Sequence, residues 1–329
     1  MPTPYDSSTG LTPPPFDICI LGETNLDLIL YGTPQELPLE REVLGSDFLM
    51  TLGGSSSILA HNLSMLGSKV AFSSLVGDDA MGEIALRYLE ESGLALSHVT
   101  RLASRKTGVT VLLPHGKQRH ILTYPGTIAE LKIEDLDYSF LTAAPHLHLS
   151  SLFLQMGLHD GLPALLDRLK AAGKTLSLDT NDDPADQWSG VLPEVLDRID
   201  LLLPNEDELL RMTHSNSLDA ALDRLQDRVP LIVVKCGVKG ALVQADGRRE
   251  WITAHRVGVV DTIGAGDSFD AGFLHAWRQG ATVNEAAAFG NLTGALSVQR
   301  PGGVEAFRDQ ELRRSFLAHS LWGQGLAQR

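Results

Sequence analysis

Short apolar runs alternate with longer segments of helical period along most of the chain. The runs are short enough to be buried strands, and they lie at residues 17–21, 69–75, 146–149, 175–179, 201–203, 231–235 and 241–244. The segments with one apolar helical face lie at 56–66, 81–92, 158–172, 206–212, 218–226, 267–279 and 283–298. This alternation predicts an α/β fold in which helices cover both faces of a mostly parallel sheet.

Two segments break the alternation, because both read as strands without intervening helices. They are residues 28–52 and 106–124, the second with an apolar run at 109–113 and a polar turn at 115–117. Ligands of open α/β sheets bind outside the carboxyl ends of the strands, so a small accessory sheet there would act as a lid. The alternative is a pair of hairpins without a function. An exposed face on such a sheet could pair with a second copy and form a homodimer.

The ends of the chain read as tails around one domain. Residues 1–15 contain no Lys or Arg and no long apolar stretch, which is unlike a secretory signal or a membrane span. Their Pro, Ser and Thr content favours a flexible, extended tail. We therefore expect one folded domain over 16–320 and a short C-terminal tail over 321–329.

Composition narrows the partners and the compartment. The chain has 329 residues, 43% of them hydrophobic, so it can bury a full core without disulfides. A formal net charge of −14 disfavours nucleic acid and anionic membranes, and favours a small-molecule partner. Cys19 and Cys236 lie in apolar runs without metal or redox spacing, which predicts buried free thiols in a reducing cytoplasm.

The most informative motif is an apolar strand end, a turn of small residues and the start of a helix. The turn is Gly264-Ala265-Gly266, and Asp267 begins the helix. Small residues let backbone amides face an anion, and the helix N-terminus adds its positive dipole end. A carboxylate beside a transferring phosphoryl group can accept the proton of an attacking hydroxyl. The alternative is a tight turn followed by an ordinary Asp N-cap.

The full string, residues 261–272, closely resembles the C-terminal signature of the ribokinase (PfkB-type) carbohydrate kinase family. The resemblance spans residues 16–307 and implies a ribokinase-like three-layer sandwich with a small β lid. It implies ATP-dependent phosphorylation of a hydroxyl on a sugar or sugar-derived molecule. In that family the residues matching Asp267 and 264–266 are the base and the anion hole. Asp261 would help to hold a monovalent cation such as K⁺, and Thr262 would lie on the nucleotide side.

A second part of the resemblance concerns the acceptor. The Gly53-Gly54 pair before a helix looks like the family's N-terminal signature, which closes on the sugar, and glycine lets a backbone approach a ligand. Asn25 and Asp27 alternate after the first strand and can share one face. A carboxylate accepts several hydrogen bonds, which suits paired hydroxyls. Arg119 opens a lid stretch similar to sugar-kinase relatives and is a further candidate for substrate binding.

The third part concerns ATP and Mg²⁺. Asn205 and Glu208 match the family's Asn-x-x-Glu element, which organises magnesium largely through water; an acidic helix N-terminus is a compatible alternative. On the nucleotide side, the resemblance points to the residues Lys235, Gly237, Gly240 and Asn291. Lys235 could meet a phosphate, or it could be a strand-end lysine that faces solvent.

Two positions depart from the family pattern. Many sugar-phosphorylating relatives have Asn where this chain has Ile58, so one hydroxyl contact is missing or supplied elsewhere. Many relatives have Arg where this chain has Asp183, and Lys235 or Arg119 could compensate for the lost phosphate contact. These departures keep open a nucleoside kinase of the same fold, with an apolar wall against a base.

Other functions are less compatible with the sequence. A non-catalytic sugar-binding regulator would be expected to lose its base, whereas Asp267 and its glycines are intact. A nicotinamide enzyme lacks Gly-x-Gly-x-x-Gly spacing after the first strand. His146 and His148 share a strand face, yet no third ligand follows at metal spacing, so we expect them to be structural.

Overall fold

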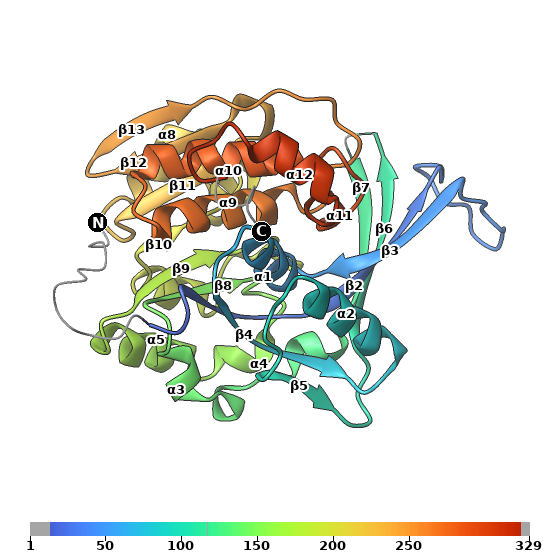
Figure 1. The fold of residues 1–329 in the computed structure, drawn as a ribbon, viewed down its shortest axis with the longest axis horizontal. Helices are drawn as coiled ribbons and strands as arrows, with labels where there is room; N and C mark the ends of the chain where they lie inside the picture. The colour runs from blue at the N-terminus through green and yellow to red at the C-terminus, as the bar shows by residue number, and fades with distance from the viewer. Residues whose placement is uncertain (1–13, 117, 324–329) are drawn as a thin grey trace.

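The computed structural model describes residues 14–116 and 118–323, and these form a nine-stranded sheet with a smaller sheet beside it (Figure 1). The order of the large sheet is β13-β12-β11-β10-β9-β8-β1-β4-β5. Its strands are β1 (Ile18–Leu21), β4 (Val70–Gly77), β5 (Val99–Leu102), β8 (His146–Ser150), β9 (Thr175–Asp179), β10 (Leu201–Leu202), β11 (Leu231–Lys235), β12 (Ala241–Ala245) and β13 (Arg248–Ile252). All neighbours from β11 to β5 pair in parallel, and this confirms the predicted α/β class.

One edge of the large sheet is antiparallel, because β12 and β13 form a hairpin on β11. Asp246 and Gly247 alone connect the two strands, with φ of 49° and 71°. Two positive φ values in an Asp-Gly loop are typical of a type I′ turn, whose twist matches that of the strands. The sequence did not predict β13, since its alternating polar residues resemble a solvated loop.

Helices cover both faces, and each face has its own core. Alternate strand residues point to opposite sides, so Ile18 and Ile20 join one core while Cys19 and Leu21 join the other. The first core is completed by α1 (Ser55–Met65), α2 (Ala80–Glu91), α9 (Ala265–Arg278), α10 (Val283–Ser297), α11 (Glu305–Arg308) and α12 (Gln310–Leu317). The second is completed by α3 (Tyr138–Leu141), α4 (Met156–His159), α5 (Leu162–Ala171), α6 (Leu192–Leu196), α7 (Glu206–Met212) and α8 (Leu218–Leu225). The result is the expected three-layer sandwich.

The predicted helix at 158–172 is wrong in one respect, because the structure has two helices there. Gly161 lies between the two helices and adopts the left-handed conformation with φ of 92°, so the helical backbone is interrupted before α5 begins. Pro163 follows in the first turn of α5, where its missing N–H costs nothing. The sequence period alone did not reveal this break.

The small sheet has the order β3-β2-β6-β7 and is formed by the two segments that interrupt the alternation. Its strands are β2 (Asn25–Tyr31), β3 (Asp47–Gly53), β6 (Gly108–His115) and β7 (Gln118–Tyr124). β2 and β6 pair in parallel, and the outer pairs are antiparallel. β2 starts three residues before the predicted segment, so Asn25 and Asp27 belong to the small sheet itself.

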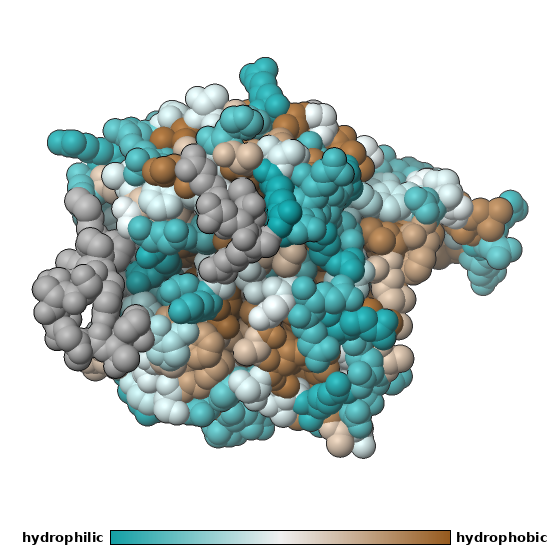
Figure 2. All heavy atoms as spheres, in the orientation of Figure 1, coloured by the Kyte–Doolittle hydropathy of each residue, from teal (hydrophilic) through white to brown (hydrophobic). Residues whose placement is uncertain are grey.

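Apolar side chains remain exposed on the small sheet and on the connection between β2 and β3, at the right of Figure 2. They include Leu39, Leu44, Phe48, Leu122 and Tyr124. Pairing with a second copy through this sheet stays a prediction.

The expected tails lie almost entirely outside the described residues, except that 14–15 and 321–323 are described. Within the described part of the chain, no helix is both long enough and apolar enough to span a membrane. Cys19 and Cys236 are buried free thiols, as the sequence predicted.

Candidate functional site

Two cavities open near the carboxyl ends of the parallel strands, on either side of the N-terminus of α9. The small cavity has a volume of about 190 Å³, and the residues around it include Asn25, Asp27, Arg119, Asn181, Gly264 and Asp267. The large cavity has a volume of about 540 Å³, and the residues around it include Lys235, Gly237, Gly240, Thr262, Gly266 and Asn291. One helix terminus therefore faces both cavities, at a place where ligands bind in open α/β sheets.

Gly264 is the N-cap residue of α9, immediately before its first helical residue. It has φ of 69°, a left-handed conformation that favours glycine, and a Cβ on it would overlap the backbone of Gly303. Ala265 and Gly266 form the first turn, where helix N–H groups lack partners within the helix. The Ala265 N–H donates to the Thr262 carbonyl at 3.3 Å, whereas the N–H groups of Gly264 and Gly266 make no backbone hydrogen bond within the described residues. These groups can bind an anion at the boundary between the two cavities.

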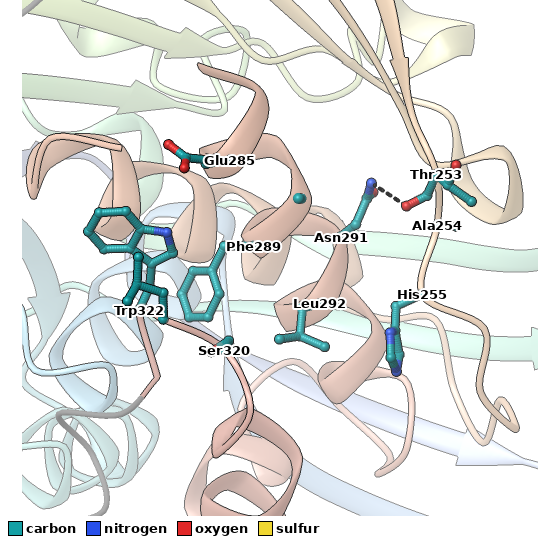
Figure 3. A pocket seen from close by; sticks show the side chains of 11 residues that line it. Thr253, Ala254, His255, Glu285, Phe289, Asn291, Leu292, Ser320 and Trp322 are labelled. Atoms are coloured by element: carbon teal, nitrogen blue, oxygen red, sulfur yellow. Dashed lines mark hydrogen bonds between the residues drawn. The ribbon is translucent and has the colours of Figure 1, made fainter. Parts of the chain in front are cut away.

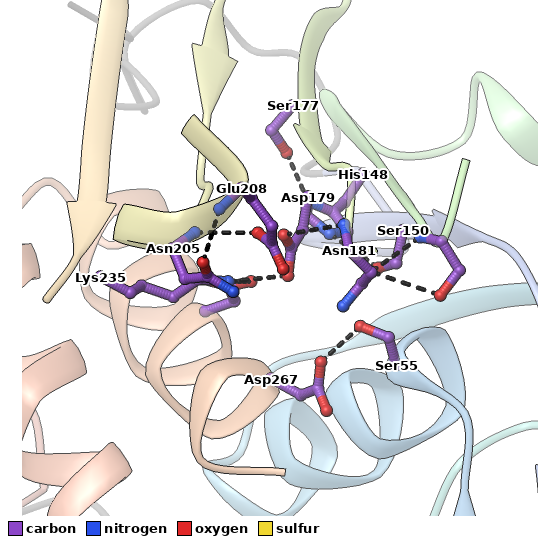
Figure 4. Close-up of polar contacts among 12 residues, drawn as sticks. Ser55, His148, Ser150, Ser177, Asp179, Asn181, Asn205, Glu208, Lys235 and Asp267 are labelled. Atoms are coloured by element: carbon purple, nitrogen blue, oxygen red, sulfur yellow. Dashed lines mark hydrogen bonds and ion pairs between the residues drawn. The ribbon is translucent and has the colours of Figure 1, made fainter. Parts of the chain in front are cut away.

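Asp267 lies in the same turn and its side chain is half-buried beside the small cavity (Figure 4). The hydroxyl of Ser55, the first residue of α1, donates a hydrogen bond to its carboxylate. Burial raises the pKa of Asp267 to about 6, although the hydrogen bond from Ser55 acts in the opposite direction. A carboxylate with such a pKa is suited to accept a proton near neutral pH.

Asn25 and Asp27 point into the small cavity from β2 and have unused acceptor atoms. The Asn25 amide donates to the Thr110 hydroxyl at 2.9 Å, while its buried Oδ1 has no partner among the described residues. Asp27 is buried, and no donor in the described chain reaches its carboxylate. Burial raises its pKa well above the usual value, and the charge of Asp267 adds to this shift. Buried acceptors that face a cavity without a protein donor are available to accept hydrogen bonds from a ligand.

The glycine pair provides the space for these two side chains. A Cβ on Gly53 would overlap the Asp27 carboxylate, and a Cβ on Gly54 would overlap the Asn25 amide oxygen. Gly54 also has φ of 80° at the start of α1. The pair thus shapes the small cavity, and direct contact between its backbone and a substrate stays a prediction.

Sequence reasoning missed three further residues of the small cavity. The Glu23 carboxylate accepts from the hydroxyls of Ser56 at 2.6 Å and of Ser151 at 2.8 Å, and burial raises its pKa. The Ser151 backbone N–H donates to Asn181 Oδ1 at 2.8 Å, so the Asn181 NH₂ group points towards Asp267 in Figure 4. Ser151 and Asn181 have φ of 52° and 53°, a conformation that no local motif signalled.

Arg119 connects the small sheet to the loop that precedes α9. It extends from β7 beside the small cavity, and its Nη1 donates to Thr262 Oγ1 at 3.2 Å. The sequence separation of this contact is 143 residues. Arg119 and Thr262 are therefore brought together, although one was predicted for the acceptor and the other for the nucleotide.

The predicted nucleotide residues line the large cavity, and two of them have clear structural roles. The Asn291 amide donates to the backbone carbonyls of Ile252 at 3.0 Å and Thr253 at 3.2 Å, which ties α10 to the end of β13 (Figure 3). Gly240 has φ of 101°, and a Cβ there would overlap the Ile252 carbonyl oxygen. A further hollow of about 430 Å³ adjoins the large cavity beyond Asn291.

Lys235 is not the solvent-facing lysine that one interpretation of the sequence expected. Its ammonium lies 2.7 Å from Asp179 (Figure 4) and 3.0 Å from Asp270. The side chain is only 10% exposed. A direct phosphate contact stays a prediction for a lysine that already has two carboxylate partners.

The predicted magnesium residues form the start of α7. Asn205 Oδ1 accepts from the Glu208 N–H at 2.9 Å, and Glu208 Oε2 accepts from the Asn205 N–H at 2.9 Å. This is a capping box, so the alternative structural interpretation is confirmed. Glu208 Oε1 makes no hydrogen bond with the described residues, so it is available to accept one from a water molecule bound to Mg²⁺. Burial and the charge of Asp179 raise the pKa of Glu208.

Asp261 has both carboxylate oxygens engaged. It accepts from the Tyr31 hydroxyl at 2.9 Å and from the N–H groups of Ile263 at 3.0 Å and Gly302 at 3.2 Å. A role in holding a monovalent cation stays a prediction. Within the described residues, no three His, Cys, Asp or Glu side chains are grouped to hold a metal by themselves.

Both departures from the family pattern have structural explanations. Ile58 lies against Gly303 and borders the small cavity, where it adds apolar surface. The Asp183 carboxylate accepts from the N–H groups of Ala185 at 3.0 Å, Gln187 at 2.7 Å and Trp188 at 2.7 Å. Asp183 therefore stabilises the conformation of the loop in which it lies.

The two strand histidines are structural, as expected. His146 Nε2 and His148 Nδ1 both lie 2.7 Å from the Ser177 hydroxyl, and both rings are fully buried. Burial lowers the pKa of His148 to about 3, so the ring is neutral.

Fold and site together define a ribokinase-like α/β enzyme. The chain belongs to the pfkB family of carbohydrate kinases, whose family model matches residues 16–310. It is 28% identical to 2-dehydro-3-deoxygluconokinase of Bacillus subtilis, over 89% of this chain and 96% of that protein. It is 24% identical to ribokinase of Haemophilus influenzae, over 92% and 99% of the two chains. The structure of Arabidopsis thaliana ribokinase complexed with ribose and ATP superposes with a TM-score of 0.77 and 24% identity, over 94% of this chain and 100% of that one.

Proposed function

We propose that the protein transfers the γ-phosphoryl group of ATP to a hydroxyl of a sugar or sugar-derived polyol. The observation that carries the proposal is the N-terminus of α9, which presents Asp267 and the 264–266 amides between two cavities. The acceptor would occupy the small cavity and ATP the large one. The solved structure of Arabidopsis thaliana ribokinase, which is complexed with ribose and ATP, supports the pairing of these two kinds of ligand on this fold.

Each residue has a defined part in this reaction. Asn25 and Asp27 accept hydrogen bonds from acceptor hydroxyls and orient the molecule. The reacting hydroxyl gives its proton to the Asp267 carboxylate while its oxygen forms a bond to the γ-phosphorus, and the bond from that phosphorus to the ADP oxygen breaks. The amides of 264–266 stabilise the charge on the phosphoryl oxygens. Asn205 and Glu208 would help to hold Mg²⁺, which when bound would supply neutralisation of phosphate charge.

The acceptor is expected to be a single sugar ring. The cavity of about 190 Å³ lies below the range of about 300 to 1,000 Å³ that is typical of ligand pockets, which favours one sugar ring over a nucleoside. The decisive experiment measures ADP formation with a panel of pentoses, hexoses, sugar acids and nucleosides. If only nucleosides were phosphorylated, the protein would be a nucleoside kinase and the proposed sugar acceptor would be wrong. No acceptor-stimulated ADP formation at all would favour a non-catalytic, sugar-binding regulator.

The pH dependence follows from the pKa of Asp267. Its pKa is raised to about 6, so the carboxylate is ionised above that pH and takes up a proton below it. Because the base must be ionised to act, kcat/KM should fall about tenfold per pH unit below pH 6. A pH series from 4.5 to 8.5 checks this, with thermal melting as the control for unfolding. Constant activity down to pH 5 would contradict the assignment.

Replacing Arg119 by Met should lower kcat/KM for the acceptor by roughly 10- to 100-fold, the usual effect of losing a charged hydrogen bond. The variant removes the guanidinium that borders the small cavity and contacts Thr262. Steady-state kinetics with the acceptor as the varied substrate measure the effect. Arg101→Met is the matched control, since Arg101 pairs with Glu83 on the surface. Equal losses in both variants would refute a specific role for Arg119.

A further inference from the structure

A buried group of charges lies beneath the first turn of α9. Its lysine, Lys235, borders the large cavity, whereas its carboxylates, Asp179 and Asp270, border neither substrate cavity. The Lys235 ammonium, at the end of β11, contacts Asp179 at the end of β9 (Figure 4). It also contacts Asp270 in α9. Both carboxylate side chains are 1% exposed. The three residues join two strand ends to one helix.

The ammonium is the one positive charge of this group. Asp270 Oδ1 is buried without a donor. Burial raises the pKa of Asp270 well above the usual range, and the charge of Lys235 acts in the opposite direction. Removing the cation would leave the buried carboxyl groups of Asp179 and Asp270 without their ionic partner, which strongly destabilises this arrangement. The lysine is therefore needed to hold the strand ends and the helix together.

The position of the group couples it to the candidate catalytic residues. Asp270 lies three residues after Asp267, on the same side of α9. The Lys235 ammonium is 3.6 Å from the place that a Cβ on Gly266 would occupy. Asp179 Oδ1 also accepts from the Asn181 N–H at 3.4 Å, and Asn181 borders the small cavity. One ammonium thus supports the anion-binding turn, the base and one wall of the acceptor cavity.

We propose that Lys235, Asp179 and Asp270 form a buried ionic clamp that fixes the first turn of α9 against the ends of β9 and β11. Lys235 is a positioning residue for Asp267 and the 264–266 amides, and it is not a phosphate ligand. This role rests on the proposed phosphoryl transfer, because it concerns the placement of that reaction's base.

The test is Lys235→Met, in which the clamp loses its charge. kcat should fall roughly 100-fold, the usual cost of a displaced catalytic group, while KM for ATP changes by less than about threefold. The acidic limb of the pH profile should move to higher pH, because the positive charge of Lys235 lowers the pKa of Asp267. A large rise in KM for ATP with an unmoved acidic limb would show that Lys235 binds phosphate, and would overturn the proposal.

Further variants separate this role from general destabilisation. Lys170→Met is the control, because Lys170 forms a lysine–carboxylate pair with Asp200 at the surface, away from both cavities. Lys235→Arg keeps the charge and should retain the position of the acidic limb. The double variant K235M/D270N should lose no more activity than K235M, since both changes break the same contact. If the fold-losses of activity in K235M and D270N multiplied in the double variant, the two residues would act independently and the clamp would be contradicted.

One readout does not depend on turnover. A carbon-13 NMR titration of the Asp267 carboxyl group, in folded protein without ATP, should give a higher midpoint in K235M than in the unmodified chain. An unchanged midpoint would overturn the clamp even if no acceptor is phosphorylated. Failure of the acceptor panel, in contrast, would refute the proposed function while this titration still reports on Lys235.

Discussion

Replacing Asp267 by Asn is expected to lower kcat by about 10³-fold, within the range of 10² to 10⁴ that general bases contribute. Asn has nearly the same shape and can still accept the hydrogen bond from Ser55, but it cannot take the proton of the acceptor hydroxyl. Nucleotide affinity should change little, because the large cavity is not altered. Initial-rate kinetics and calorimetric titration with ATP measure the two quantities.

The control for this variant is Asp219→Asn. Asp219 lies in the first turn of α8, as Asp267 does in α9, but it forms a surface pair with Arg249. Such a pair contributes at most about 1 kcal/mol, so the control should keep normal turnover. If Asp267→Asn retained more than a tenth of the activity, the base would have to be another residue.

Replacing Gly264 by Ala is expected to reduce kcat by roughly 10²- to 10³-fold, as the loss of one anion-hole donor does. The added Cβ would overlap the backbone of Gly303, so the turn must move and its amides lose their alignment. The left-handed φ of 69° adds about 1 kcal/mol of backbone strain. KM for the acceptor should change much less than kcat, since Asn25 and Asp27 stay in place.

Gly190→Ala is a matched control for the strain alone. Gly190 also has φ of 69°, yet a Cβ on it would meet nothing within 4 Å. Both variants should lose similar stability from strain in thermal melting, with a further loss in Gly264→Ala from the overlap. Only Gly264→Ala should lose turnover. Comparable turnover in the two variants would mean that the amides of this turn do not bind the phosphoryl group.

The sequence alone predicted the α/β class, most of the elements and the motif around Asp267. These features depend on local properties: buried strands need short apolar runs, helices need one apolar face, and an anion-binding helix start needs small residues. The turn at 264–266 and the capping box at Asn205 and Glu208 are determined within a few neighbouring residues. For this reason Glu206–Met212 was predicted at its observed bounds.

Local pattern was insufficient where one residue or a distant partner decides the conformation. Gly161 divides a segment of continuous helical period, because its positive φ interrupts the helix. The hairpin of β12 and β13 depends on a two-residue turn that an apolar pattern does not show. Glu23 joins the small cavity through Ser151, which lies 128 residues away in the sequence.

Only the tertiary structure decided what each charged side chain in the site does. From the sequence, Lys235 could either contact a phosphate or face solvent. In the fold it pairs with two buried carboxylates, one from β9 and one from α9. The Asp183 carboxylate accepts hydrogen bonds from its own loop. Arg119, from the small sheet, donates a hydrogen bond to Thr262. The physical reason is that burial and charge pairing are set by partners far apart in the sequence. The sequence therefore determined where a helix start with small residues and a carboxylate would form, and the packing of distant strand ends determined which charges surround it.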